Sequence, residues 1–429
     1  MARSSTRATL TALVSAAVLA GGCQAGSPSS SSGAAAKDDG TVITMWTRAP
    51  TAPFTGALVT AYNKSHKNKV RLTVIPADSY QQKVGTAAGA RRLPDILASD
   101  VVYAPNYAAH NLYLDISQRV RKLPFAGKLA AAHMRTATRN GRIYAVPHDI
   151  DLSAMFYNTV LFKRAGLDPD QPPTTMNAVY ADAAKINRLG GGVHGFYIDG
   201  SCPGCWLFKT WPTIWASGGT VLNPQGTAST IDNPVAANVY RLYRKIWQAG
   251  LTPKGSKNEN GPTQTQAFAD GKIGLDPLGA TALQIMKEGK DLQVGVAPIP
   301  GLTGGSSSFV GGDVVGISSG SPHAAQSWDF ISWTLTARTQ VDVVAANKNI
   351  TVRTDLENNK YAQADPRLRT FNRLAARGRT PISVNFGKTY NDPNGPWTAT
   401  AYDAVFGAAD PAAALHRHNP AITSSLASR

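Results

Sequence analysis

The alternation of strand-like and helix-like segments constrains the fold of this 429-residue chain more than any other feature. In the first quarter of the chain, strand patterns occur at residues 41–46, 70–75 and 93–98, and helix patterns at residues 54–67 and 80–90. Such alternation predicts an α/β fold with a largely parallel sheet. Ligands of such sheets bind beyond the carboxyl ends of the strands, where Trp46 and Asp100 are expected to lie.

The alternation continues through the rest of the chain. Strands are expected at residues 141–147, 272–275, 294–299 and 314–318, and helices at residues 158–166, 235–250, 322–335, 365–377 and 397–406. Ser321 is the expected N-cap of the helix at residues 322–335. No internal repeat is evident, and the length suffices for two ordinary domains.

The N-terminus has the pattern of an export signal. Arg3 and Arg7 precede an apolar stretch at residues 10–20, which is shorter than the roughly 20 residues that a bilayer requires. The segment ending at Gly22-Cys23 resembles a bacterial lipobox, which implies cleavage after residue 22 and lipid on Cys23. The alternative is an ordinary secretory signal with a chance cysteine. We expect residues 1–22 to be a lipoprotein signal peptide and residues 23–40 to be a flexible tether.

The formal net charge of +16 raises the question of a nucleic-acid partner. The basic residues are scattered, however, and form no stripe interleaved with aromatic side chains. We therefore expect a solvated basic surface, no nucleic-acid partner, and contact with the membrane through the lipid anchor alone.

Two further cysteines, Cys202 and Cys205, are separated by Pro203 and Gly204. In a cytosolic protein this spacing would suggest a thiol redox site. In an exported chain the pair is expected to form a disulfide that stiffens a local turn beside Trp206, with a modest entropic gain because the loop is short. His416 and His418 lack a third ligand at useful spacing, so neither a metal site nor a cofactor is expected.

Four motifs in order are similar to those of extracellular solute-binding protein family 1, the maltose-binding-like group of ABC importers. The motifs are Gly141-Arg-Ile-Tyr-Ala-Val-Pro147 with the segment at residues 156–175, Phe268-Ala-Asp-Gly-Lys272, Gly295-Val-Ala-Pro-Ile-Pro-Gly301, and the segment at residues 311–336. The resemblance implies a two-lobed, periplasmic-binding-protein-like (type II) α/β fold with a hinge and a ligand cleft between lobes. It implies that the first lobe consists of residues 41–150 and 295–339, and the second lobe of residues 151–294 and 340–429. It also implies that the protein delivers its ligand to permease subunits. We expect a monomer.

A carbohydrate is the expected solute, because aromatic rings can cover the apolar face of a sugar while carboxylates, amides and guanidinium groups bind its hydroxyls. The candidate ligand-binding residues are Trp46, Asp100, His148, Asp149, Asp151, Trp215, Asp276, Gly312, Asp313, Arg353 and Trp397. Among them Trp397 is the preferred stacking residue, since it ends a turn-rich loop at a helix start.

Two other functions compete with sugar binding. A secreted glycosidase would need two carboxylates that face each other across the scissile bond, and the three glutamates all lie in polar stretches typical of a surface. The same fold could instead bind a polyol phosphate, a polyamine or a peptide. Five aspartates and one arginine among the candidates favour a neutral sugar or an amino sugar over a phosphorylated ligand.

Overall fold

The computed structural model describes residues 37–261 and 263–428. The predicted signal peptide, the lipidation site Cys23 and tether residues 23–36 therefore lie outside the described residues. No helix in the described ranges is both long and apolar enough to cross a membrane.

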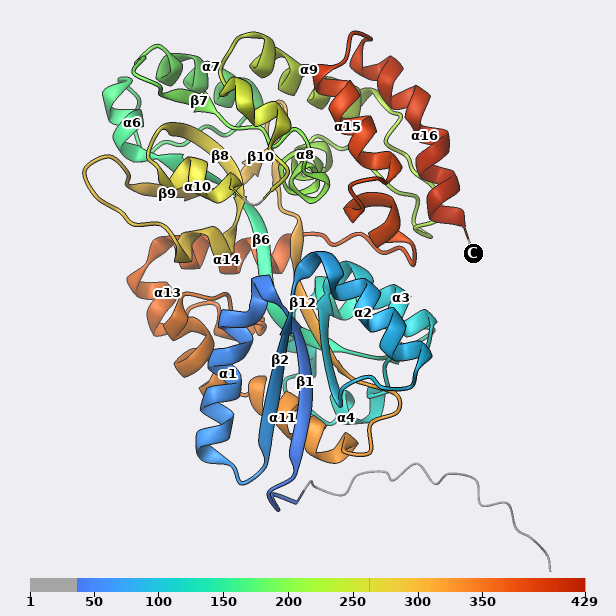
Figure 1. Cartoon of the computed structure of the whole chain (residues 1–429). Helices are drawn as coiled ribbons and strands as arrows, with labels where there is room; N and C mark the ends of the chain where they lie inside the picture. Colours follow the sequence, from blue (N-terminus) through green and yellow to red (C-terminus); the bar gives the residue numbers. More distant parts are fainter. Residues whose placement is uncertain (1–36, 262, 429) are drawn as a thin grey trace, which may run out of the picture. The chain divides into compact units, whose positions relative to one another are not determined.

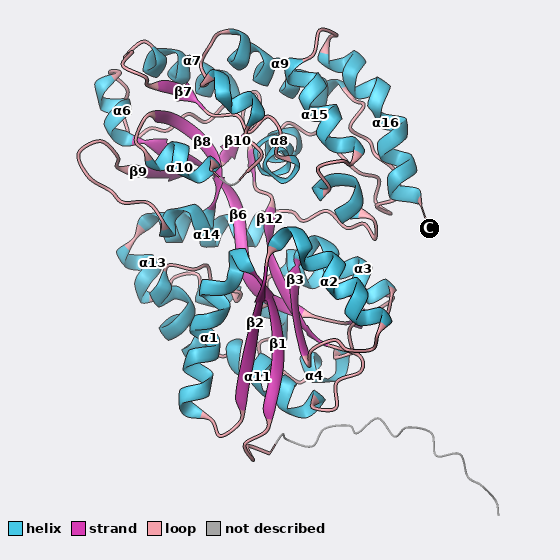
Figure 2. Ribbon diagram, in the orientation of Figure 1, coloured by secondary structure: helices cyan, strands magenta, loops and turns pink. Residues whose placement is uncertain are grey.

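An eight-stranded mixed sheet organises the described part of the chain (Figures 1 and 2). Its order is β2 (Lys69–Ile75), β1 (Val42–Arg48), β3 (Ile96–Asp100), β12 (Val310–Ile317), β6 (Val146–Asn158), β8 (Ile273–Gly279) and β7 (His194–Phe196), with β9 (Val294–Ala297) also paired to β6. The pairs β1–β2, β1–β3 and β7–β8 are parallel, whereas β12 is antiparallel to both of its neighbours. The predicted α/β class is confirmed.

Strand β6 changes partners halfway along its length. Its first half, from Val146 to Leu152, pairs with β12, and its second half, from Ser153, pairs with β8 and β9. The sequence predicts a strand only at residues 141–147, whereas β6 continues as one buried strand from Val146 to Asn158. Figure 1 shows β6 running between the elements around β1 and those around β8. A single strand thus connects the two groups of elements.

Helices flank the strands around β1, as the sequence predicts. They are α1 (Ala52–Ser65), α2 (Ala77–Gly89), α3 (Ala104–Ala109), α4 (Ser117–Arg121), α5 (Ala131–Thr136) and α11 (Ala324–Thr334), with a short ribbon of β4 (Thr138–Arg139) and β5 (Arg142–Ile143). The cap assigned to Ser321 is wrong, because α11 begins after His323. The Ser321 hydroxyl instead donates to Asp95 and accepts from the amide of His323.

A second group of helices packs on β8, either directly or through other helices of the group. It comprises α6 (Thr159–Arg164), α7 (Met176–Asn187), α8 (Pro203–Ala216), α9 (Pro234–Gln248), α10 (Gln264–Ala269), α15 (Pro396–Phe406) and α16 (Pro411–Ala427). Of these, α7, α8 and α10 contact β8 directly. Side chains of Asn158, Thr175 and Asn233 cap α6, α7 and α9, which explains where these helices start. The remaining elements are β10 (Ile299–Pro300), β11 (Ser306–Ser307), α12 (Ala337–Thr339), α13 (Lys360–Ala364) and α14 (Pro366–Arg377).

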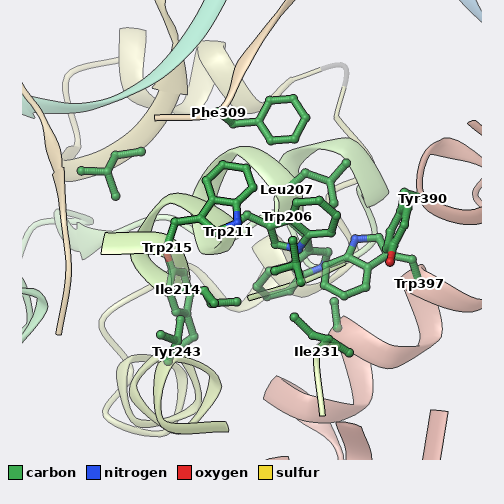
Figure 3. Close-up of a cluster of buried hydrophobic side chains, with 14 of the residues drawn as sticks. Trp206, Leu207, Trp211, Ile214, Trp215, Ile231, Tyr243, Phe309, Tyr390 and Trp397 are labelled. Atoms are coloured by element: carbon green, nitrogen blue, oxygen red, sulfur yellow. The ribbon is translucent and has the colours of Figure 1, made fainter. Parts of the chain in front are cut away.

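An aromatic cluster fixes α8 against the C-terminal helices (Figure 3). Trp211 packs edge-on against Tyr390 and Trp397 at centroid distances of 5.0 and 5.6 Å. Trp206 packs against Tyr243 of α9 at 6.1 Å. Large rings packed in this way contribute strongly to stability, so α8 has a well-defined position. That position matters because the first turns of α8 reach the cavity described next.

Candidate ligand-binding site

A cavity of about 490 Å³ lies where the two groups of elements meet along β6. Its wall combines the ends of β1 and β3, the middle of β6, the start of α8, the end of β8 and the start of β12. Its lining includes Arg48, Thr51, Asp100, Asp149, Asp151, Cys202, Cys205, Phe208, Thr281, Phe309, Gly311 and Gly312. The volume suits a small organic solute.

Three aspartates stand in register across adjacent strands beside this cavity. Asp313 of β12 is paired with Asp100 of β3 on one side and with Asp149 of β6 on the other. Carboxylates placed directly opposite one another on neighbouring strands repel when ionised. The row therefore needs a cation, protonation or a ligand to stabilise it.

Arg48 supplies a cation to one end of this row. Its guanidinium donates to Oδ1 of Asp313 and lies 3.4 Å from Oδ2 of Asp100. The Thr51 hydroxyl donates to the other oxygen of Asp313 at 3.0 Å. Burial alone would lower the pKa of Arg48, but the two carboxylates outweigh burial and raise that pKa above its usual value. Arg48 is therefore a fixed positive charge that is engaged by protein carboxylates.

Asp149 and Asp151 are less well compensated. Asp149 is 2% exposed, and within the described part of the chain its Oδ1 has no hydrogen-bond partner. Burial, followed by repulsion from Asp313 and Asp151, raises the pKa of Asp149 well above its usual value. Asp151 accepts from the amide of Thr281 at 3.0 Å, and burial raises its pKa to about 6.

The pKa values of Asp100 and His148 are also shifted from their usual values. Burial raises the pKa of Asp100, and the charge of Arg48 partly offsets this rise. The Nε2 atom of His148 lies 3.0 Å from the Thr55 hydroxyl, and its ring packs edge-on against Phe54 at 5.1 Å. Burial lowers the pKa of His148 to about 4, so the imidazole is neutral near pH 7. His148 thus supports the wall from behind.

Two phenylalanines form an apolar part of the wall. The rings of Phe208 and Phe309 lie 5.1 Å apart with an angle of 32° between their planes. Gly311 allows this arrangement, because a Cβ there would come within 2.9 Å of the Phe208 ring. Gly312 is needed for a different reason: its φ of +95° is strained for other residues, and a Cβ would come within 2.2 Å of the Asp149 carbonyl oxygen.

Cys202 and Cys205 form a disulfide at the start of α8, which confirms the predicted pair. The expected local turn is the first turn of this helix, with Cys202 as its N-cap residue. Both cysteines line the cavity together with Pro203 and Gly204. The disulfide therefore holds part of the cavity wall.

Seven predicted site residues lie outside the cavity lining. Two of them, His148 and Asp313, stand directly behind it, as described above, and the other five are held elsewhere. Trp397 is fully buried in the aromatic cluster, where its indole N–H donates to the carbonyl of Pro203, so it presents no surface for stacking. Asp276 is fully buried and pairs with Lys209, which also lies 2.8 Å from Asp199. The turn chemistry near Trp397 located the helix start correctly, but the indole points into the core.

The other three are held by different neighbours. Arg353 forms a salt bridge with Asp355 and lies over the ring of Phe125 at 4.0 Å. Trp46 lies on β1 with the Lys83 ammonium 5.2 Å from its ring. Trp215 stacks on the Phe309 ring at 6.0 Å, behind the cavity wall, and lines a separate depression with Arg379.

Sequence reasoning missed Arg48, Phe208 and Phe309. Arg48 ends the strand on which Trp46 was chosen, two residues further towards the carboxyl end. Phe208 belongs to an aromatic series at helical spacing after Cys202, which could have indicated that α8 carries a side chain into the site. Phe309 lies three residues before the predicted Gly312.

Comparison with known proteins identifies the family. Residues 47–341 match the model of the bacterial extracellular solute-binding proteins, which covers more than half of the chain. This chain belongs to that family. A member, MalE from Xanthomonas citri, described as a sugar-binding protein, superposes with a TM-score of 0.78 at 19% identity over 90% of this chain and 98% of its own. The predicted fold, a two-lobed solute-binding fold, is confirmed.

Curated relatives of this solute-binding protein align over different lengths. A binding protein of Brucella abortus is 30% identical over 212 residues, which are 49% of this chain and 50% of that protein. The chain thus spans about half the length of the Brucella relatives that it matches. The diacetylchitobiose-binding protein DasA of Streptomyces coelicolor is 24% identical over 366 residues, 83% of each chain.

Proposed function

We propose that this solute-binding protein captures a mono- or oligosaccharide between two lobes and delivers it to the permease subunits of an ABC importer. The observation that carries the proposal is the cavity beside β6, which places polar groups and an aromatic pair around one volume of about 490 Å³. The name of the relative DasA, a diacetylchitobiose-binding protein, supports a carbohydrate ligand.

The chemistry of the wall suits a sugar ring. Phe208 and Phe309 offer apolar surface for the C–H face of a ring, while Asp100, Asp149 and Asp151 can accept hydrogen bonds from its hydroxyl groups. A clustered set of arginines or lysines, which a phosphorylated ligand would favour, is absent from the described lining, where Arg48 is already paired with carboxylates.

We place the division between the lobes within β6, where its partner changes from β12 to β8 between Leu152 and Ser153. On this basis β9 belongs with the second lobe, because it pairs with the second half of β6. The segment after α11 stays with the first lobe until at least Val352, whose carbonyl accepts from the amide of Ala130. A ligand that contacts both lobes would favour a closed form.

We also propose that the chain does not convert its ligand, that it acts as a monomer, and that lipid on Cys23 anchors it to the outer face of the cell membrane. The names of the relatives as binding proteins support the first part, and the lipobox-like sequence before Cys23 supports the last. An anchor of this kind would keep the receptor at high effective concentration near its importer.

Calorimetry of the full chain against a panel of neutral sugars, amino sugars, polyol phosphates and polyamines tests the proposal, with chromatography of the ligand afterwards. We expect saturable one-site binding of a sugar and recovery of the ligand unchanged. If only a non-sugar binds, the proposal that the ligand is a carbohydrate is wrong. If hydrolysis products appear, the proposal that the chain binds its ligand without converting it is wrong.

A further inference from the structure

We propose that the cavity recognises a sugar that carries a protonated amine, with the ammonium group held by Asp149 and Asp151. This inference rests on the proposed function, because it names the ligand class of the same cavity. It follows from the charges of the wall, from one buried carboxylate oxygen without a partner, and from the apolar surface next to them.

The charges around the cavity do not balance. Its charged lining within the described residues consists of Asp100, Asp149, Asp151 and Arg48. Asp313, directly behind them, takes the guanidinium of Arg48, which it shares with Asp100. Four carboxylates thus face one cation, and the cation is already engaged by two of them. An ammonium group from the ligand would supply the missing positive charge.

Asp149 is the decisive residue. It lines the cavity, is 98% buried, and its Oδ1 has no hydrogen-bond partner in the described chain. Leaving such an oxygen unpaired in a low-dielectric site costs stability. An ammonium group in the cavity beside Asp149 would offset this cost through its charge. Burial and repulsion from Asp313 and Asp151 raise the pKa of Asp149, so a bound cation would stabilise its ionised form.

Neighbouring groups do not supply that charge. Lys209 lies near β8, but it is fully buried and paired with both Asp199 and Asp276. His148 precedes Asp149 in β6, but burial lowers its pKa to about 4 and leaves it neutral. Among the described residues, no three acidic, histidine or cysteine side chains are grouped in a way that could hold a metal ion. These positions favour an organic cation.

The apolar wall restricts what kind of organic cation fits. Phe208 and Phe309 form an aromatic pair, and Leu207 and Leu278 extend the apolar lining. Asn260, Gln264 and Asn391 add amide groups that can bind hydroxyls. A linear polyamine would leave these amides without hydroxyl partners. A pyranose with an amine group uses the carboxylates, the rings and the amides together.

The test compares sugars that differ only in the group at C2 of each ring. Calorimetry of the full chain at neutral pH would measure D-glucosamine against D-glucose and N-acetyl-D-glucosamine, and chitobiose against N,N′-diacetylchitobiose. We expect the amine to bind about ten-fold more tightly or better than its neutral match, as a charge-assisted hydrogen bond would give. Asp149→Asn should remove most of this preference, because the neutral amide no longer attracts an ammonium group. Asp291→Asn, which changes an exposed carboxylate away from the cavity, is the matched control.

The possible outcomes separate the two proposals. Equal or tighter binding of the neutral sugars by the unmodified chain would overturn the amino-sugar inference and leave sugar binding intact. Failure of every sugar to bind would overturn both. If Asp149→Asn does not fold, as judged by circular dichroism, the comparison of ligands on the unmodified chain still decides the inference.

Discussion

Asp149 of β6 lies directly opposite Asp313 of β12, and Arg48 contacts Asp313 while Asp149 keeps an oxygen unpaired within the described chain. The two carboxylates have the same chemistry and neighbouring positions, yet only one is neutralised by the protein. Strand register brings such charges together irrespective of their repulsion. Perturbed carboxylates of this kind concentrate at functional sites, because a ligand and not the fold compensates them.

The raised pKa of Asp151 predicts a pH-dependent stability of the ligand-free chain. Its pKa is about 6 in the folded state against about 3.9 for an unfolded chain, so the folded state holds the proton more tightly. The stabilising effect is complete below pH 4 and is lost as the pH rises through 6. We expect the Asp151 contribution to the free energy of unfolding to fall by about 2 kcal/mol between pH 4 and pH 7.

Urea denaturation of the unmodified chain and of Asp151→Asn, at several pH values, measures this contribution as a difference. The difference is needed because His133 and His148 act in the opposite sense: their pKa values are lowered to about 4, so their contribution is lost as the pH falls below 6.5. Both histidines are present in both proteins, so their contributions to the free energy of unfolding cancel in the difference. A difference that stays constant from pH 4 to pH 7 would contradict the prediction.

Phe208 and Trp397 are expected to respond differently to truncation. Phe208→Ala removes a ring from the cavity wall and should weaken sugar binding by about 2 kcal/mol, as the loss of an aromatic anchor does. Trp397→Ala removes a fully buried ring and should lower the free energy of unfolding by about 3–5 kcal/mol. Calorimetry and urea denaturation measure the two effects.

The control for these variants is Trp247→Ala, which truncates a partly buried ring that packs on Phe406 away from the cavity. It should leave sugar binding unchanged. If Trp397→Ala kept full stability but lost sugar binding, the indole would have to reach the ligand, and its assignment to the core would be wrong.

Periodicity in the sequence located most elements because local patterns decide them. The strand expected at residues 41–46 is β1, and the helix expected at residues 235–250 is α9. Helix α8 was missed because nearly all of its residues are buried, so it lacks the polar face on which a periodic pattern depends. The continuity of β6 was missed because Pro147 suggested an end to the strand, whereas its position next to a register shift accommodates a proline.

The site could be predicted in part for a similar reason. Asp100 lines the cavity from the carboxyl end of β3, where ligands of α/β sheets bind. Asp149 and Asp151 reach the cavity from the middle of β6, and Gly312 reaches it from the start of β12. Trp397 could not be placed, because the direction of a side chain at a helix start depends on tertiary packing against Trp211 and Tyr390. Sequence patterns give the position of a residue along an element but not which neighbours its side chain contacts.

The buried group of Lys209, Asp199 and Asp276 should be necessary for stability. Burial alone would lower the pKa of Lys209, but its two carboxylates raise it, so the ammonium stays charged. Lys209→Met leaves both carboxylates without their cation and should cost about 3–5 kcal/mol in the free energy of unfolding. Replacing Asp199 and Asp276 by Asn in the same chain should recover part of that loss. Equal stability of Lys209→Met and the unmodified chain in urea denaturation would show that the ion group contributes nothing.

The disulfide between Cys202 and Cys205 should affect binding more than stability. The loop that it closes is short, so reduction should lower the free energy of unfolding by roughly 2 kcal/mol or less. The bridged residues form part of the cavity wall and the first turn of α8, so their release should weaken sugar binding several-fold by loosening groups that the ligand contacts. Calorimetry with and without dithiothreitol measures the effect. The variant with both Cys202→Ser and Cys205→Ser should bind sugar like the reduced chain, and dithiothreitol should not change its affinity. If dithiothreitol weakens sugar binding by this variant as well, the effect of the reductant comes from elsewhere in the chain.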